Sequence, residues 1–151
     1  MQATTKHDLF FVRRNTNRNE VHYAIHLSPD SGLPDGPHPL TGYWKMFEKG
    51  PEVTEPILLV EQMAFGIRSQ RREGDNFVMV LNALPEREIR IEPEPGETGR
   101  YTARMVIAGK IARLTDFYVQ ADAGFLMPKV RYLDINGEAD GQPVTERINK
   151  G

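Results

Sequence analysis

The fold is decided by residues 9–27, which read Leu-Phe-Phe-Val-Arg-Arg-Asn-Thr-Asn-Arg-Asn-Glu-Val-His-Tyr-Ala-Ile-His-Leu. Both ends of this stretch, Leu9–Arg13 and Glu20–Leu27, are rich in apolar residues, and the polar centre between them contains three asparagines. Asparagine tolerates a positive φ and hydrogen-bonds to its own backbone, so it is typical of turns. The stretch therefore predicts a β-hairpin.

Side chains alternate along the second arm of this hairpin. Val21, Tyr23, Ile25 and Leu27 fall on one face, and the residues between them are His22, Ala24 and His26. This period of two is typical of an antiparallel strand with one face in the core.

Composition limits the class of protein. The chain has 151 residues, 39% of them hydrophobic and 26% charged, which suits one soluble globular domain. The formal net charge is −2, so the chain does not have the excess of basic residues typical of a nucleic-acid binder, and no nucleic-acid partner is expected. The absence of cysteine excludes disulfides and thiolate chemistry. No apolar run approaches the ~20 residues of a transmembrane helix.

The next part of the chain predicts a loop, a strand and a helix. Residues 28–40 contain four prolines and read as a loop, and Tyr43–Glu48 reads as a short strand. Thr54-Glu55-Pro56 has the capping hydroxyl, acid and proline of a helix start, and Gly66 is a natural terminator. We expect one short helix near residues 55–65.

From Ile67 onward the pattern is strand and turn, with a favoured hairpin signal at Asn136-Gly137 in a last loop that reaches Gly141. The expected strands are Ile67–Arg71, Phe77–Leu81, Arg87–Glu92, Tyr101–Ile107, Ile111–Val119, Lys129–Ile135 and Pro143–Ile148. The fold class is therefore all-β and mainly antiparallel, with about ten short strands in a barrel or sandwich. We expect a single β-rich domain over residues 9–149, with residues 1–8 as a disordered tail or an expression remnant.

Several separated motifs resemble the bacterial domain-of-unknown-function family 4833. The resemblance covers nearly the whole chain, from Leu9 to Ile148. Its motifs are Phe10 and Arg14-Asn15 with Asn17, Asn19, Val21 and Tyr23, then Tyr43-Trp44, Glu61 with Ala64–Ile67, Ala83-Leu84-Pro85, Ile107–Leu114 and Tyr118-Val119.

The resemblance implies an exported protein without an established activity, since the family consists mainly of small proteins that enter the export pathway. It implies a periplasmic or secreted location and a signal peptide removed before Gln2. The chain departs from the family pattern at Phe65, where relatives often have tyrosine, so a hydrogen bond from that hydroxyl is not expected here.

The sequence predicts no catalytic residue, no metal ligand and no cofactor. His22 and His26 share a strand face but lie about 13 Å apart along it, too far to bind one metal ion together. The serines lack the Gly-x-Ser-x-Gly context of a nucleophile, and no glycine-rich phosphate loop is present.

The hairpin supplies the candidate binding residues, with two alternatives left open. Arg13 and Arg14 point to opposite faces of one strand, so either could be held by Glu61 or Asp116 as a structural ion pair. The other alternative is a rim of polar donors for an anionic or sugar ligand, beside aromatic residues that line a pocket. The predicted ligand-binding residues are Arg14, Asn15, Asn17, Asn19, Tyr23 and Trp44.

The leading functional hypothesis is a non-enzymatic β-domain of the cell envelope that binds a small molecule or an envelope protein. A second hypothesis is an enzyme with His22 or His26 as base and Arg14 as anion clamp. A third is a scaffolding protein that pairs with another chain through the edge strand Pro143–Ile148. The oligomeric state stays open.

Overall fold

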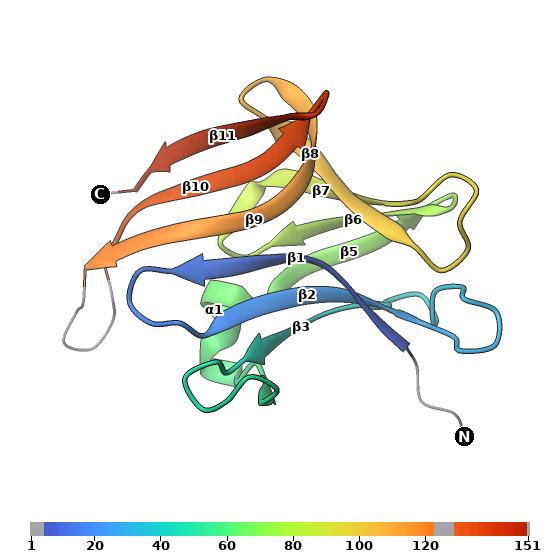
Figure 1. Cartoon of the computed structure of the whole chain (residues 1–151), viewed down its shortest axis with the longest axis horizontal. Helices are drawn as coiled ribbons and strands as arrows, with labels where there is room; N and C mark the ends of the chain where they lie inside the picture. The colour runs from blue at the N-terminus through green and yellow to red at the C-terminus, as the bar shows by residue number, and fades with distance from the viewer. Residues whose placement is uncertain (1–4, 123–128, 151) are drawn as a thin grey trace.

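The computed structural model describes residues 5–122 and 129–150, which form one curled sheet and one short helix (Figure 1). The eleven strands of the described residues are β1 Thr5–Arg14, β2 Glu20–Leu27, β3 Leu40–Lys45, β4 Thr54–Pro56, β5 Ile67–Glu73, β6 Asn76–Leu81, β7 Leu84–Pro93, β8 Tyr101–Ile107, β9 Lys110–Asp122, β10 Lys129–Ala139 and β11 Gln142–Asn149. The prediction of a mainly antiparallel β fold with one short helix is confirmed, and the barrel or sandwich is a half-barrel.

The strand order is β4-β3-β2-β1-β9-β8-β7-β6-β5, and β10 and β11 extend the sheet from β9. Every pair is antiparallel except β1 and β9, which run parallel from Phe11 beside Asp116 to Arg14 beside Val119. β9 pairs with β8, β1 and β10, so it joins the two halves of the chain. Among the described strands β11 pairs only with β10, so it is an edge strand, as predicted for Pro143–Ile148.

The first hairpin forms as predicted, but its first strand is longer. β1 begins at Thr5, which lies opposite Leu27, the last residue of β2. Residues 5–8 therefore belong to the sheet and not to a tail, because the long second arm offers them backbone partners. Residues 1–4 of the predicted tail lie outside the described residues.

The predicted helix start at Thr54-Glu55-Pro56 is wrong, because these residues form β4 beside β3. The helix consists of a 3₁₀ turn, Leu59–Glu61, followed by α1, Gln62–Phe65, and it ends at Gly66 as predicted. The carboxylate of Glu61 caps it by accepting a hydrogen bond from the Leu58 N–H at 2.8 Å. Thr54 fits an edge strand as well as a helix cap, and Pro56 ends the strand.

The last hairpin turns at Asp140-Gly141 and not at Asn136-Gly137. Asp140 and Gly141 both have positive φ, as a type I′ turn requires. Gly137 lies within β10, where the register shifts and a Cβ would collide with the Arg113 carbonyl. Glycine is therefore needed there for a close backbone approach, and not for a turn.

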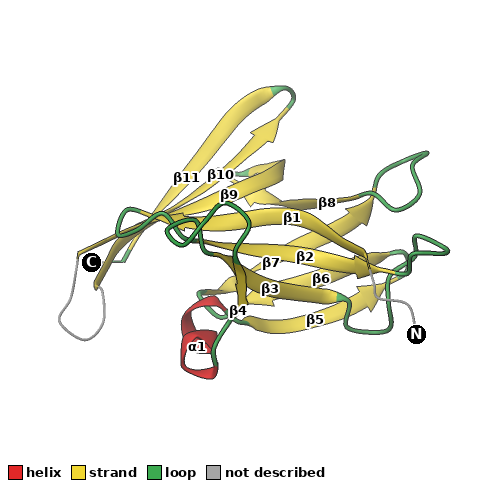
Figure 2. Cartoon of the chain, turned by 60° about the horizontal axis from the view of Figure 1, so that its bottom comes forward, coloured by secondary structure: helices red, strands yellow, loops and turns green. Residues whose placement is uncertain are grey.

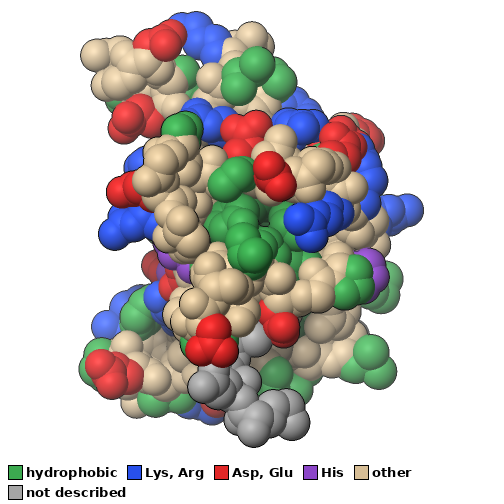
Figure 3. All heavy atoms as spheres, turned by 90° about the vertical axis from the view of Figure 1, so that its right-hand side faces the viewer, with side chains coloured by type: hydrophobic (Ala, Val, Ile, Leu, Met, Phe, Trp, Pro, Cys, Tyr) green, Lys and Arg blue, Asp and Glu red, His purple; other side chains and the backbone are tan. Residues whose placement is uncertain are grey.

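The core fills the concave face of the sheet. Phe10 stacks on Tyr23 at 4.8 Å between ring centroids and meets Phe117 edge-on at 5.8 Å. Val21, Tyr23, Ile25 and Leu27 are all buried there, as the alternation predicted. At the end of the half-barrel on the right of Figure 1, apolar side chains at the centre are ringed by charges (Figure 3). No helix in the described part of the chain is long and apolar enough to span a membrane.

The curl brings β5, at one end of this strand order, close to β3, which is next to the end strand β4 on the other side. The side chain of Gln70 on β5 hydrogen-bonds to the backbone of Leu40 on β3 and bridges them. The short helix is part of the connection between β4 and β5, and it projects from the underside of the sheet (Figure 2). The contact between β3 and β5 and the position of the short helix determine the shape of the concave face.

Candidate ligand-binding site

The concave face contains an apolar pocket of about 280 Å³, which we call the inner pocket. Residues of β1, β2, β6, β7, β9 and β10 form its wall together with the short helix. Its main apolar side chains are Val12, Phe65, Leu84, Phe117, Val119 and Leu133. This volume is near the lower end of the usual range for small-ligand sites, about 300–1,000 Å³.

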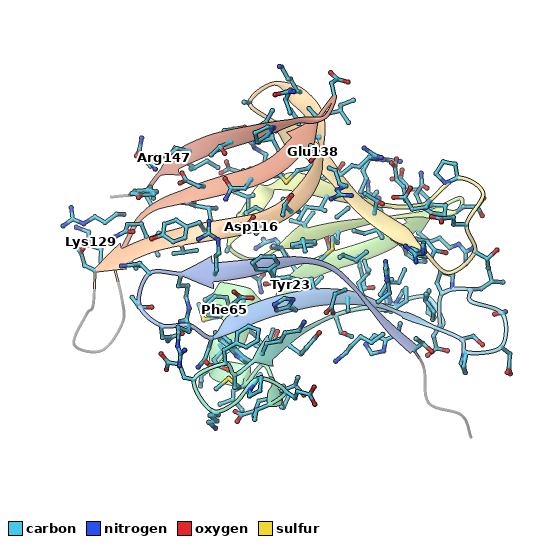
Figure 4. The ribbon with its side chains drawn as sticks, in the orientation of Figure 1. Tyr23, Phe65, Asp116, Lys129, Glu138 and Arg147 are labelled. Carbon is cyan, nitrogen blue, oxygen red and sulfur yellow. The ribbon has the colours of Figure 1, made fainter. Side chains whose placement is uncertain are left out.

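The inner pocket offers little acid–base chemistry. Among the described residues that line it, only Tyr23 and Lys150 are titratable. The Tyr23 hydroxyl donates a hydrogen bond to the Phe65 carbonyl at 2.7 Å, and burial raises the pKa of this phenol. Figure 4 shows Tyr23 on β2 and Phe65 by the short helix. Tyr23 therefore fixes the helix against the sheet and stays neutral.

Phe65 separates the inner pocket from a second, more polar one of about 260 Å³, the rim pocket. Arg14 lies here, with its guanidinium carbon 4.8 Å from the ring centroid of Trp44 and 5.6 Å from that of Phe65. Its Nη2 donates to Asn17 Oδ1 at 2.8 Å, and its buried Nε has no partner among the described residues. Burial lowers the pKa of Arg14, while the carboxylates of Glu61 and Glu48 act in the opposite direction.

The predicted binding residues are only partly brought together. Arg14, Asn17, Asn19 and Trp44 line the rim pocket, whereas Tyr23 lines the inner pocket and Asn15 lines neither. Glu55 and Glu61 also line the rim pocket, which makes it less suited to an anion than the sequence alone indicates.

The asparagine side chains are engaged in the fold. Asn15 forms two hydrogen bonds with the backbone of Ala121, at 2.9 and 2.8 Å, and so ties the end of β1 to β9. Asn17 Oδ1 accepts from the Asn19 N–H at 3.0 Å, and Asn19 Oδ1 accepts from the Glu48 N–H at 2.9 Å. These amides shape the turn and its neighbours, so a ligand would have to compete with bonds already formed.

Of the two arginines, Arg13 forms the structural ion pair that was one of the two alternatives from the sequence. On the convex face its Nε donates to Asp116 Oδ2 at 2.9 Å, and its guanidinium lies over the Tyr118 ring. Asn136 donates to the same carboxylate oxygen at 3.1 Å. Arg14 points the other way, so one arginine is drawn inward and the other pins the outer face.

The residues of the enzyme hypothesis lie on opposite faces of the sheet. His22 stacks on Phe11 on the convex face, whereas Arg14 faces the concave side. His22 Nε2 lies 2.9 Å from Glu20 Oε1, and His26 Nε2 lies 2.7 Å from Thr41 Oγ1. Burial lowers the pKa of His22, while its hydrogen bond with Glu20 acts to raise it. Neither histidine can therefore act with Arg14 on one reacting group.

No cluster of three or more His, Asp and Glu side chains able to hold a metal ion occurs within residues 5–122 and 129–150. Sequence reasoning missed the aliphatic wall of the inner pocket, such as Leu84 and Leu133. In a sequence these residues have the same alternation as ordinary core residues, and only the curl of the sheet leaves space between them.

The fold and pockets define a half-barrel β-domain with an apolar concave pocket. The chain matches the family described as Domain of unknown function (DUF4833) over residues 10–147, and it belongs to that family. The match confirms the resemblance carried by the motifs of the sequence. No curated protein matches the chain, and no solved structure matches it.

Proposed function

We propose that this protein is a non-enzymatic binding protein that holds a small apolar ligand, such as an acyl chain, in the inner pocket. The observation that carries the proposal is the pocket itself, whose wall is almost wholly aliphatic and aromatic. Apolar surface left uncovered inside a fold is favourable for a ligand of the same character, because burial removes both surfaces from water.

Lys150 favours an acyl chain with an acidic head group. Its side chain is exposed at the edge of the pocket, and it is the cation among the pocket's described residues. A carboxylate or phosphate beside Lys150 would keep its contact with water while the chain enters the pocket. A fatty acid should therefore bind more tightly than the matching alcohol.

The test is binding of cis-parinaric acid, a fluorescent fatty acid, followed by displacement with saturated fatty acids. Trp44 is the only tryptophan of the chain and packs on Phe65 at 5.1 Å, so energy transfer from Trp44 reports binding next to it. We expect one saturable site per chain. Native mass spectrometry of protein purified from its own host would identify the bound compound.

Val119→Phe, which fills the pocket from β9, should weaken probe binding about tenfold or more, and Ala83→Phe does the same from the pocket edge. Val53→Phe is the matched control, because Val53 lies outside the pocket. Melting curves of all three variants separate lost binding from lost folding. Absent probe binding, or binding that survives both pocket variants, would overturn the proposal.

The proposal includes a location in the periplasm or outside the cell, as the family resemblance implies. It is tested by fractionation of the native host and by sequencing the N-terminus of the protein found there. Recovery of the protein with the cytoplasmic markers alone would remove this part and leave the pocket proposal intact.

A further inference from the structure

We propose that the short helix at residues 59–65 docks on a phospholipid membrane, with its apolar tip inserted among the lipids. This goes beyond the inner pocket, because docking needs only the outer surface of the helix. The tip consists of Leu59, Val60 and Met63, whose exposed fractions are 88%, 84% and 86%. Leu58 beside them is 59% exposed.

Such exposure is unusual for large apolar side chains that are next to one another. The three side chains are exposed on a helix that projects from the sheet (Figure 2). A protein partner would need a matching hole, whereas a bilayer accepts projecting apolar side chains of any arrangement. The shape of the tip therefore favours a lipid surface.

The tip is also free of exposed charge. Residues 56–66 contain one charged residue, Glu61. Its Oε1 accepts hydrogen bonds from Trp44 Nε1 at 3.1 Å and from the Leu58 N–H at 2.8 Å, so this carboxylate is turned toward the protein. Inserting the tip would not require a charge to leave water, which is the main cost of burying a polar segment.

Two cations flank the helix. Arg68 follows its terminal Gly66 by two residues, and Lys150 lines the inner pocket together with Ala64 and Phe65 of the helix. Both side chains are exposed, and neither forms an ion pair within the described part of the chain. Cations beside an inserted apolar segment interact with lipid phosphates, which complements the apolar contact.

The helix also connects the membrane surface to the inner pocket. Ala64 and Phe65 line the pocket, while Val60 and Met63 lie on the outer side of the same turns. A membrane-bound helix would thus place the pocket next to the lipids, where an acyl chain is available.

The experiment is co-flotation of the full chain with vesicles of phosphatidylcholine, with and without phosphatidylglycerol. We expect the protein to float with both, and more strongly with phosphatidylglycerol. Leu59→Glu with Met63→Glu should reduce partitioning at least about tenfold, because two exposed apolar anchors become charged. Arg68→Gln with Lys150→Gln should remove the preference for phosphatidylglycerol.

The matched control is Val106→Glu with Ile111→Glu. These residues face each other across β8 and β9 and are also exposed, Ile111 to 75%. The control should float like the unchanged protein. The proposal would be overturned if the protein does not float, or if the control loses as much flotation as the tip variant. It would also be overturned if neither protein binds vesicles and light scattering shows a dimer that the tip variant abolishes. Val119→Phe should keep flotation, so failure of the pocket proposal is distinguishable.

Discussion

The side-chain amide of Gln70 forms with Leu40 the two hydrogen bonds that a neighbouring strand would form. Its Oε1 accepts from the Leu40 N–H at 3.0 Å, and its Nε2 donates to the Leu40 carbonyl at 2.9 Å. One glutamine thus continues the sheet across the gap between β3 and β5. It satisfies backbone groups of the buried residue Leu40 that no strand of the described residues covers on this side.

Gln70→Ala should therefore destabilise the protein by about 2 kcal/mol, because it leaves the N–H and C=O of Leu40 without protein partners. Urea unfolding followed by circular dichroism measures this change. Gln142→Ala on the exposed edge is the control, with an expected change within about 0.5 kcal/mol. Equal stability of the two variants would show that water replaces the Gln70 amide without loss.

Gly137→Ala should destabilise the protein by about 2–3 kcal/mol, because the new methyl group would meet the Arg113 carbonyl and the Ile107 side chain. Gly141→Asn should change stability by less than about 1 kcal/mol, since asparagine tolerates the positive φ of that turn. Thermal unfolding of both variants makes the comparison. If Gly141→Asn loses more stability than Gly137→Ala, the requirement for glycine is stronger in the turn than at the close backbone contact, against this prediction.

Asp116→Ala should cost about 2 kcal/mol, because the buried carboxylate holds both Arg13 and Asn136. The share from Arg13 is modest, since that side chain is half-exposed and solvent screens it. Asp116→Asn keeps one acceptor, so its free energy of unfolding in urea should lie between those of the unchanged protein and the Asp116→Ala variant. Asp75→Asn, at an exposed turn, should be neutral; a matching loss there would point to net charge as the cause.

The stability of the protein should fall as the pH drops below about 6.5 because of His22. Burial lowers the pKa of His22 in the folded state, so near this pH the unfolded chain binds more protons than the folded one. Stability from neutral His22 is full above the unfolded pKa and is lost as the pH falls toward the folded pKa. Asp8, Glu20, Lys45, Tyr43 and Phe11 face the ring and set the size of the effect.

His22→Gln should flatten this part of the profile, measured by urea unfolding from slightly alkaline to mildly acid pH. His38→Gln, at an exposed position in the proline-rich loop, should leave the profile unchanged. Identical profiles for the His22 variant and the unchanged protein would show that carboxylates alone cause the pH dependence.

Local sequence patterns predicted much of this fold. The rest depends on contacts between residues far apart in the sequence, which those patterns do not specify. Alternation in residues 20–27 predicted the face of β2 that is buried, because a strand fixes side-chain direction within itself. The parallel contact between β1 and β9 could not be predicted, since no feature of either strand specifies a partner so distant in sequence. The turn of the last hairpin moved for a similar reason: Asn-Gly and Asp-Gly are both good turn sequences, and packing against Arg113 decides between them.

The candidate site was less predictable than the fold. The sequence grouped Arg14 and Trp44 in one candidate binding set, and in the structure the guanidinium of Arg14 lies over the Trp44 ring. The sequence did not indicate that the Asn15 side chain hydrogen-bonds to the backbone of Ala121. Nor did it indicate that His22 and Arg14 lie on opposite faces of the sheet. Empty space between aliphatic side chains depends on curvature, which the pattern of residues does not encode.

The parallel pairing of β1 with β9 has a consequence for how the protein is made. During synthesis the first strand leaves the ribosome long before its partner exists, so one edge of the N-terminal hairpin must wait without a neighbour. Closing so long a stretch of chain is slow, and a waiting edge attracts other nascent chains. Until β9 is available, the early hairpin therefore has an unpaired edge, of the kind that is prone to pair with another chain.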